Sequence, residues 1–372
     1  MNYILFDGDV RNALLPFTYT KPVADIRIGI LTIREKWEKY LSLTTTTITE
    51  EYLESKYPMV EMEENVLLNA SFCPTENLVE RVKKLSKNEA IFKGEDVIAF
   101  FTSDTQEEVD FSTYKQIEFE EELIQVKNTW DIFSLNDKAI RQDFDLLTDG
   151  RTSAPIPETV NCIHKEAIFV EEGAKLTFAT LNASTGPIYI GKDAEIMEGC
   201  IVRGAFAMCN NSVLKLGAKI YGATTLGPYC KVGGEVNNSV LSGYSNKGHD
   251  GFLGNSVIGE WCNLGADTNN SNLKNNYAEV KLWSYEKERF AKTGLQFCGL
   301  IMGDHSKCGI NTMFNTGTVV GVSANIFGSG FPRNFVPSFS WGGAAGFTTF
   351  QMKKVYEVVT AVMKRRSLVF DE

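Results

Sequence analysis

Aliphatic residues recur at every sixth position through much of the second half of this 372-residue chain. The longest set runs without a gap, and two shorter sets follow it. The positions are Ile190, Ile196, Val202, Met208, Leu214, Ile220, Leu226 and Val232, then Phe252, Ile258 and Leu264, then Met302, Cys308, Phe314, Val320 and Ile326. A period of six matches neither the two-residue period of a strand nor the 3.6-residue period of a helix. A lone sheet or a helix therefore does not explain it.

The six-residue period fits a triangular prism, in which each face is a short strand and three hexads complete one coil. The aliphatic residue points inward and stacks on its equivalent in the next coil. A small residue, often Gly, follows it where the chain turns a corner. We therefore predict a left-handed parallel β-helix over residues 155–335, which buries its core by stacking coils. An ordinary β-sandwich is the alternative.

Two segments interrupt the repeat, 235–251 and 267–299. The first carries polar residues and glycines where the register slips, and the second is too long and too polar for one coil. Insertions in solenoids map to loops, often on the binding face. We expect both segments to leave the column as loops.

The first 150 residues follow a different pattern, in which short apolar runs alternate with segments of helical spacing. We expect strands at 3–6, 44–49 and 65–68, a hairpin at 90–101, and helices at 26–41, 50–56, 76–85 and 129–142. This alternation is typical of a layered α/β domain. We place the domain at residues 1–150.

A linker and a final helix complete the predicted organisation. Residues 149–155 are rich in Gly, Ser and Pro and predict a linker to the β-helix. Apolar residues at helical spacing predict a C-terminal helix over residues 349–366. Its basic end, 364–366, suits the negative end of a helix dipole.

Composition excludes several classes of function. The net charge is -10, with 37 Lys and Arg against 47 Asp and Glu, which argues against a nucleic-acid partner. No stretch approaches the roughly 20 apolar residues of a membrane span, and the N-terminal segment lacks the pattern of a signal peptide. The eight cysteines form no C-x-x-C pair, so a zinc pattern is absent and no metal ligand is predicted. We expect reduced cysteines in a cytoplasmic protein.

One of the three histidines, His249, has a setting that favours a function. It lies in segment 243–251, inside the first interruption of the repeat, where we expect no apolar face to bury it. Functional residues concentrate on loops that a rigid scaffold positions. An imidazole there could accept a proton from an amine or a hydroxyl at neutral pH. We therefore predict His249 as a general base, although a lone histidine more often has a structural role.

The sequence around His249 resembles the acetyltransferase half of the bifunctional N-acetylglucosamine-1-phosphate uridyltransferase family. Residues 246–254, NKGHDGFLG, are similar to a Lys-x-Gly-His loop that precedes a Tyr-Leu-Gly coil in that family. Residues 258–268, IGEWCNLGADT, are similar to its I-G-x-x-x-N-I-G-A-G-T coil, and residues 299–318 resemble the coils that line its acetyl-CoA site. The resemblance covers about residues 155–330.

This resemblance implies CoA-dependent acyl transfer to a sugar phosphate or a nucleotide sugar, in a homotrimer whose neighbouring subunits complete the site. His249 would be the general base, and acetyl-CoA the donor substrate. The implied substrate contacts are Lys247, Asn263, Asn272 and Lys274, and the implied CoA contacts are Gly309, Ile310, Val320 and Gly321.

The chain departs from the family pattern at positions that would contact the acceptor. Phe252 replaces a tyrosine, which removes a hydroxyl group, and Asp267 replaces a glycine. Pro228 and Lys231 match part of a GP-x-A-R-x-R coil whose arginines are missing here. The sugar and the acyl group therefore stay open.

The N-terminal domain resembles a reduced branch of the sugar-phosphate nucleotidyltransferases, of the kind often labelled glucose-1-phosphate thymidylyltransferase, with a short Rossmann-like fold. The family begins with a strand and a glycine-rich loop, whose backbone N–H groups approach a triphosphate. Here the loop keeps Gly8 between Asp7 and Asp9. The resemblance makes Gly8, Arg11 and Lys21 weak candidates for nucleotide or sugar-phosphate contacts, and an active domain would need Mg²⁺.

Three functions therefore remain open. The first is acyl transfer with His249 as the base, and the second is nucleotidyl transfer from a nucleoside triphosphate to a sugar 1-phosphate through the N-terminal domain. The third is a non-catalytic protein that binds sugar nucleotides.

Overall fold

The computed structural model describes residues 1–103 and 109–370. The chain divides into two compact units. Unit 1 comprises Met1–Leu14, Thr18–Arg27 and Leu31–Asn128, and unit 2 comprises Leu15–Phe17, Ile28–Ile30 and the chain from Thr129 onward. The predicted end of the α/β domain at residue 150 and the predicted start of the β-helix at residue 155 stay predictions.

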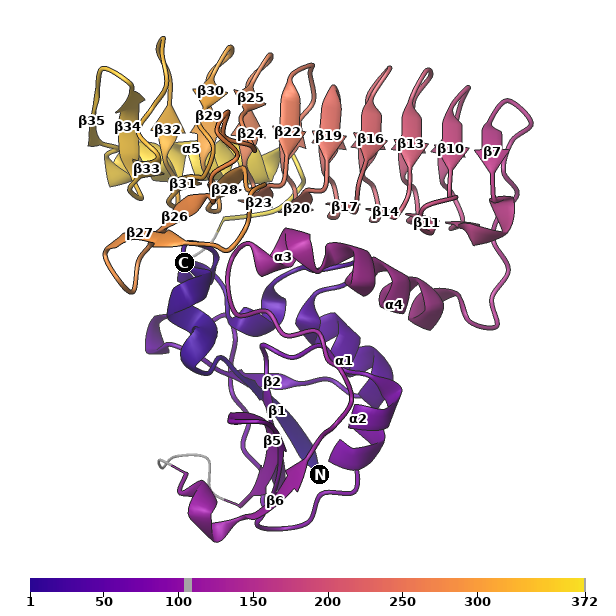
Figure 1. The fold of residues 1–372 in the computed structure, drawn as a ribbon, viewed down its shortest axis with the longest axis vertical. Helices are drawn as coiled ribbons and strands as arrows, with labels where there is room; N and C mark the ends of the chain where they lie inside the picture. Colours follow the sequence, from indigo (N-terminus) through magenta and orange to yellow (C-terminus); the bar gives the residue numbers. More distant parts are fainter. Residues whose placement is uncertain (104–108, 371–372) are drawn as a thin grey trace. The chain divides into compact units, whose positions relative to one another are not determined.

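Unit 1 is built on a mixed sheet with strand order β2-β1-β3-β5-β4-β6 (Figure 1). Strand β1 pairs in parallel with β2 and β3, whereas β3 and β4 pair antiparallel with β5. The bounds are β1 (Asn2–Phe6), β2 (Thr46–Ile48), β3 (Asn65–Asn69), β4 (Glu89–Lys93), β5 (Asp96–Thr102) and β6 (Lys115–Glu118). The predicted α/β domain with its strands and hairpin is confirmed.

The helices of unit 1 are shorter than the sequence pattern predicts. They are α1 (Ile33–Leu41) and α2 (Glu76–Val82), with short 3-10 turns η1 (Asp9–Leu14), η3 (Val23–Asp25), η4 (Glu51–Leu53) and η5 (Phe111–Thr113). The prediction that a helix begins at residue 26 is wrong. Thr32 and Glu35 form a reciprocal capping box that fixes the start of α1 at Ile33. The predicted helix at 50–56 is only the single turn η4.

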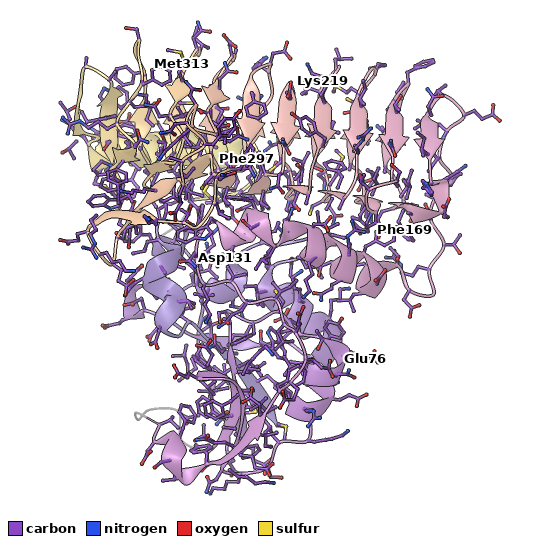
Figure 2. The ribbon with its side chains drawn as sticks, viewed as in Figure 1. Glu76, Asp131, Phe169, Lys219, Phe297 and Met313 are labelled. Carbon is purple, nitrogen blue, oxygen red and sulfur yellow. The ribbon has the colours of Figure 1, made fainter. Side chains whose placement is uncertain are left out.

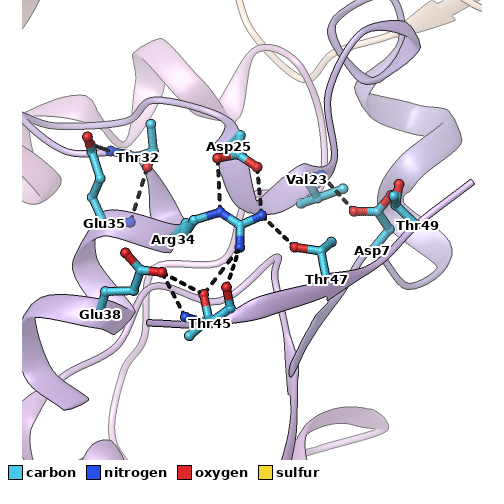
Figure 3. Close-up of polar contacts among 10 residues, drawn as sticks. All are labelled: Asp7, Val23, Asp25, Thr32, Arg34, Glu35, Glu38, Thr45, Thr47 and Thr49. Atoms are coloured by element: carbon cyan, nitrogen blue, oxygen red, sulfur yellow. Dashed lines mark hydrogen bonds and ion pairs between the residues drawn. The ribbon is translucent and has the colours of Figure 1, made fainter. Parts of the chain in front are cut away.

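Arg34 ties α1 to the neighbouring loops and to β2 (Figure 3). Its guanidinium group binds both carboxylate oxygens of Asp25, at 3.0 and 2.8 Å, and also contacts Thr45 and Thr47. Two parallel N–H···O bonds between a guanidinium group and a carboxylate fix the relative orientation of the two groups and also stabilise the ion pair. The edge of the sheet at β2 is therefore held by side chains as well as by backbone pairing.

Unit 2 is a β-solenoid over residues 161–342, confirming the predicted parallel β-helix. In the described part of the chain its strands form three long sheets, which we name faces 1, 2 and 3. Face 1 contains β7 (Asn161–Ile163), β10 (Thr180–Asn182), β13 (Ile201–Arg203), β16 (Lys219–Tyr221), β19 (Glu235–Asn237) and β22 (Phe252–Gly254). Face 2 contains β8 (Ile168–Val170), β11 (Ile188–Ile190), β14 (Phe206–Met208), β17 (Thr224–Leu226), β20 (Val240–Gly243), β23 (Val257–Glu260), β28 (Leu300–Met302), β31 (Thr318–Val320) and β33 (Phe335–Val336).

Face 3 follows the other two in each coil and carries the final hairpin. Its strands are β9 (Lys175–Leu176), β12 (Glu195–Ile196), β15 (Val213–Leu214), β18 (Lys231–Val232), β21 (Asn246–Lys247), β24 (Asn263–Leu264), β29 (Lys307–Cys308), β32 (Asn325–Ile326), β34 (Ser340–Gly343) and β35 (Gly346–Thr349). From β7 to β24, each coil thus places one short strand on each face.

The aliphatic residues of the six-residue repeat form the buried core. On face 2, Ile190 pairs in register with Met208, and Met208 with Leu226. All three side chains are fully buried, as are their counterparts on the other faces. Burying one such side chain stabilises the folded protein by about 1.5–3 kcal/mol. The stacked columns of buried side chains therefore stabilise a solenoid whose strands are each only two to four residues long.

The prediction that residues 235–251 leave the column as a loop is wrong. They form an ordinary coil through β19, β20 and β21, whose corners are shorter than those of the preceding coils. The shorter corners shift the register, so that Leu253 points inward beside Val236 while Phe252 is half-buried. The sequence analysis placed Phe252 in the core because it lies six residues before Ile258, but the corner between β22 and β23 is one residue shorter, so Leu253 is the inward residue.

The second interruption does leave the column. Residues 269–270 form β25 (Asn269–Asn270), which pairs with β30 (Met313–Phe314). Between β25 and β28 the chain makes an antiparallel hairpin of β26 (Lys281–Ser284) and β27 (Arg289–Lys292). Face 1 is interrupted at β22 because side chains replace the backbone ladder: Asn270 Oδ1 accepts from Gly254 N at 2.9 Å, and Asn269 Oδ1 accepts from Phe252 N at 2.8 Å.

Three helices accompany the solenoid within the described part of unit 2 (Figure 1). The predicted helix at 129–142 is split into α3 (Asp131–Ser134) and α4 (Asn136–Thr148), and Asn136 binds Ala223 O and Thr225 Oγ1 of face 2. The predicted C-terminal helix is confirmed as α5 (Met352–Lys364), which buries Val355 and Val359. In the described residues, no helix has the length and apolar character needed to cross a membrane.

Candidate functional site

His249 lies at the edge where the chain passes from face 3 to face 1. This edge is formed by the corners that follow β21, β24 and β29, residues 248–251, 265–268 and 309–312, and we name it the His249 edge. The imidazole is exposed. The backbone beneath it is fixed, because Asp250 O accepts from Asp267 N at 3.0 Å and Gly251 O accepts from Glu235 N at 3.2 Å. The edge therefore presents an accessible base on an ordered corner.

The register of face 3 brings two other predicted residues, Gly309 and Ile310, to the same edge. Asn246 pairs with Asn263, and Asn263 with Lys307, so the corners that follow these strands stack on one another. Asn263 is exposed on face 3, in the strand that leads into the next corner of the edge. Gly309 and Ile310 occupy the corner one coil further, and Ile310 is 69% exposed. With strands about 4.8 Å apart, His249 and Ile310 are about 10 Å apart along this edge.

Lys247 belongs to the same coil as His249 but lies inside the prism. It pairs in register with Val232, is 1% exposed, and donates from Nζ to Gly233 O and His249 O, both at 2.9 Å. Burial lowers its pKa to about 8, against the opposing effect of Asp250 and Asp267. A side chain held in the core does not reach a substrate on the outer surface.

The other predicted contacts of the solenoid lie away from the His249 edge. Asn272 binds Asn255 Oδ1 at 2.8 Å, at the corner that follows β22, and Lys274 donates to Glu279 O at 3.0 Å within the inserted segment. Val320 is an inward-pointing core residue of face 2, and Gly321 is buried directly after it. The structure thus groups His249 with Asn263, Gly309 and Ile310, and separates it from these four.

Unit 1 contains a cavity of about 490 Å³ at the carboxyl ends of β1 and β3. Ligands of open α/β sheets bind in the crevice outside the carboxyl ends of parallel strands. Phe6, Phe92, Phe100 and Phe111 form an aromatic wall, in which Phe100 and Phe111 meet edge to face at 5.1 Å. The cavity suits a flat or partly apolar group such as a nucleobase or a sugar face.

Polar groups converge on this cavity from separate strands and loops. Asn69 is the last residue of β3 and is fixed by hydrogen bonds with Ser71 and Val97 O, whereas Asp96 accepts from Lys127 Nζ at 2.7 Å. Gln125 donates to Asp96 at 3.3 Å. The sequence analysis selected none of Asn69, Asp96 and Gln125. The position of Asn69 at a strand end was a usable signal, but nothing local predicted the other two.

The predicted N-terminal residues have different positions. Gly8 lines the cavity, in a left-handed conformation with φ +61°. Arg11 is buried beside it and donates to Glu50 Oε1 at 3.0 Å, Thr18 O at 2.7 Å and Tyr52 OH at 2.8 Å. Lys21 is also buried. Neither cation is among the residues that line the cavity, and the hydrogen bonds of Arg11 brace the loops around it.

Asp7, which precedes Gly8 in the loop after β1, turns away from the cavity. Its carboxylate accepts from Val23 N at 2.7 Å and from Thr49 Oγ1 at 2.6 Å (Figure 3). Burial raises the pKa of Asp7, although these two hydrogen bonds and Arg11 oppose the change. Asp7 therefore holds the loop after β1, and Asp9 is the acidic neighbour of Gly8 that faces the cavity.

The residues of this cavity do not assemble a site for Mg²⁺. Across residues 1–103 and 109–370, no three His, Cys, Asp or Glu side chains come together as metal ligands. Asp96 is already paired with Lys127.

A second cavity, of about 610 Å³, opens on face 1 at β13 and β16. Its lining includes Ile201, Arg203, Lys219 and Tyr221, and Figure 2 labels Lys219 on this face. Burial and the hydrogen bond to Glu235 raise the pKa of Tyr221 to about 12. None of the residues selected from the sequence lines this cavity.

Comparisons with known proteins give one family match. Residues 3–152 match the family model described as "Sugar nucleotidyl transferase". No curated protein matches the chain. The matched segment is less than half of the chain and covers the described sheet, helices and cavity of unit 1.

Solved structures that match include AntD, an N-acyltransferase from Bacillus cereus, in complex with dTDP and 3-hydroxybutyryl-CoA. The sequence identity is 13%, the match covers 56% of this chain and 91% of that chain, and the TM-score is 0.24. A point mutant of the same enzyme, in complex with dTDP-4-amino-4,6-dideoxyglucose and coenzyme A, matches at 13% identity over 55% of this chain and 90% of that chain, with a TM-score of 0.24.

Proposed function

We propose that this chain is a transferase of sugar-nucleotide metabolism that transfers an acyl group from acyl-CoA to an amino-sugar phosphate or nucleotide at the His249 edge. The observation that carries the proposal is the edge shared by His249, Gly309 and Ile310, with Asn263 on the strand that leads into it. Their register was not available from the sequence, yet it groups an exposed base with an amide and with a corner suited to an apolar cofactor arm.

In this reaction the imidazole of His249 accepts the proton of the acceptor amine as its nitrogen attacks the thioester carbonyl carbon. The tetrahedral intermediate then collapses, the carbon–sulfur bond breaks, and the CoA thiolate leaves and takes up a proton. General base catalysis of this kind contributes about 10²–10⁴-fold. Asn263 would hold the acceptor or the carbonyl oxygen, and Gly309 and Ile310 would contact CoA.

The experiment compares two exposed histidines. Purified wild-type protein, His249→Ala and His164→Ala are assayed for CoA release from acetyl-CoA with a panel of amino-sugar 1-phosphates and amino-sugar nucleotides. We expect His249→Ala to lower kcat about 10²-fold or more and His164→Ala to leave it unchanged. Equal turnover in wild type and His249→Ala would contradict the proposal, and binding of acceptors without any turnover would support the non-catalytic alternative.

A second function, nucleotidyl transfer to a sugar 1-phosphate, is favoured by the family match and by the cavity at the ends of β1 and β3. Nucleoside triphosphates are added to the wild-type protein and to Val10→Trp, which would fill the cavity that Val10 lines, with Val60→Trp on an exposed surface as the control. We expect thermal stabilisation by the nucleotide in wild type and control but not in Val10→Trp. Release of pyrophosphate with a sugar 1-phosphate then separates catalysis from binding.

A further inference from the structure

Lys247 occupies a position that the rest of face 3 gives to apolar side chains. It pairs in register with Val232, and its neighbour Asn246 pairs with Asn263, so that Leu264 lies directly after it in the column. Placing an amine in an apolar core is unfavourable unless its hydrogen-bonding groups are satisfied. Packing alone would favour leucine or valine here, so the amine requires another explanation.

The amine connects the His249 corner to the corner of the preceding coil, which follows β18. Its Nζ donates to Gly233 O in the preceding corner and to His249 O in its own corner, both at 2.9 Å. The two corners also approach closely, because a Cβ at Gly234 would lie 2.9 Å from His249 O and 2.8 Å from Asp250 Cα. The interior side chain therefore bonds the backbone of the residue whose imidazole is exposed outside.

Charged groups around the amine come from its own corner and from the next coil. Asp250 and Asp267 both favour its protonated form, while burial favours the neutral form. The backbone carbonyls of Gly233 and His249 accept hydrogen bonds from either form. The hydrogen bonds thus do not depend on full protonation.

We infer that Lys247 is a positioning residue that holds the His249 corner from inside the solenoid and so orients the imidazole at the outer edge. This inference rests on the proposed acyl transfer and deepens it. A general base must stay within hydrogen-bond reach of the proton that it accepts. A misplacement of about 1 Å costs about 10²-fold in rate, so a bond to the backbone of the base itself matters for turnover.

The test compares Lys247→Met with Leu264→Met, which places the same side chain in the same column one coil away. We expect Lys247→Met to lower kcat about 10- to 100-fold, with KM for acetyl-CoA unchanged, since the position of the base is altered and the cofactor contacts are not. Leu264→Met conserves volume, and we expect its kcat to stay at the wild-type value. Lys247→Arg, which keeps donors, should recover part of the rate.

A second measurement does not require catalysis. The chain has three histidines, so protein labelled with 13C at the imidazole Cε1 gives one resonance for His249. We expect this resonance to shift or broaden in Lys247→Met and to stay unchanged in Leu264→Met, with the His164 resonance constant in both. If wild type shows no acyl transfer, the proposed function fails, and this spectrum still decides the role of Lys247.

Unchanged kcat together with an unchanged His249 resonance in Lys247→Met would overturn the inference. If Lys247→Met does not fold, Lys247→Arg decides, because arginine keeps donors but its planar guanidinium group cannot take the place of the amine. We then expect the His249 resonance to shift in Lys247→Arg while the His164 resonance stays constant. An unshifted His249 resonance in Lys247→Arg would overturn the inference as well.

Discussion

Lys247 pairs in parallel register with Val232, so an amine takes a place in a column of buried apolar residues. The same column contains Leu176, Ile196, Leu214, Val232, Leu264, Cys308 and Ile326. This single polar position has consequences for stability that are separate from its proposed role at His249.

The stability of the wild-type protein should rise with pH relative to Lys247→Met. The pKa of Lys247 is lowered to about 8, below the value near 10.5 of an unfolded lysine. Between these values the unfolded chain binds more protons than the folded protein, so raising the pH favours folding. We expect the difference in the free energy of unfolding to move by about 3 kcal/mol in favour of wild type across this range. Urea denaturation at several pH values measures it, and parallel pH profiles would contradict the prediction.

Gly265→Ala should destabilise the solenoid far more than Gly248→Ala. A Cβ at Gly265 would lie 2.4 Å from the carbonyl carbon of Gly309, whereas a Cβ at Gly248 meets nothing within 4 Å. Forcing the backbones of two coils apart costs about 1–3 kcal/mol, as other forms of overpacking do. Thermal unfolding of the two variants measures the difference, and equal melting temperatures would show that the corners separate easily.

Arg11→Met should lower the stability of unit 1 and leave nucleotide binding nearly unchanged. Arg11 binds Glu50, Thr18 O and Tyr52 and does not line the cavity. Losing hydrogen bonds from a charged group costs about 1.5–3 kcal/mol. Arg81→Met, at an exposed position of α2, is the control. If Arg11→Met binds nucleotide more weakly but is as stable as the wild type, the prediction is wrong. Arg11 would then contact phosphate, as the sequence resemblance implies.

Asn270→Ala should destabilise the coil that follows β22. The Asn270 side chain accepts from Gly254 N at 2.9 Å and donates to Gly254 O at 3.1 Å, in place of a backbone ladder. Leaving a buried N–H without an acceptor costs about 1–3 kcal/mol. Asn275→Ala, in the exposed part of the insertion, is the matched control. Chemical denaturation measures the free energy of unfolding of both variants. Equal free energies would show that water or a shifted strand accepts the hydrogen bond of Gly254 N–H.

The prediction for residues 235–251 shows where a one-dimensional repeat stops being informative. The six-residue spacing predicted the solenoid and most of its core, because each coil repeats the same inward position. It gave the wrong inward residue, Phe252 in place of Leu253, because corner length varies between coils. Spacing cannot distinguish a loop from a coil with short corners, since both interrupt the count.

The amino-acid sequence by itself determined the solenoid, the α/β character of unit 1 and the terminal helix, because these depend on local periodicity of apolar side chains. It also singled out His249. Only the tertiary structure decided that Lys247 points inward, that Ile310 shares an edge with His249 while Asn272 and Val320 do not, and that Arg11 braces a loop. Those facts depend on which coils and strands stack in register, which is set by contacts between residues far apart in the chain.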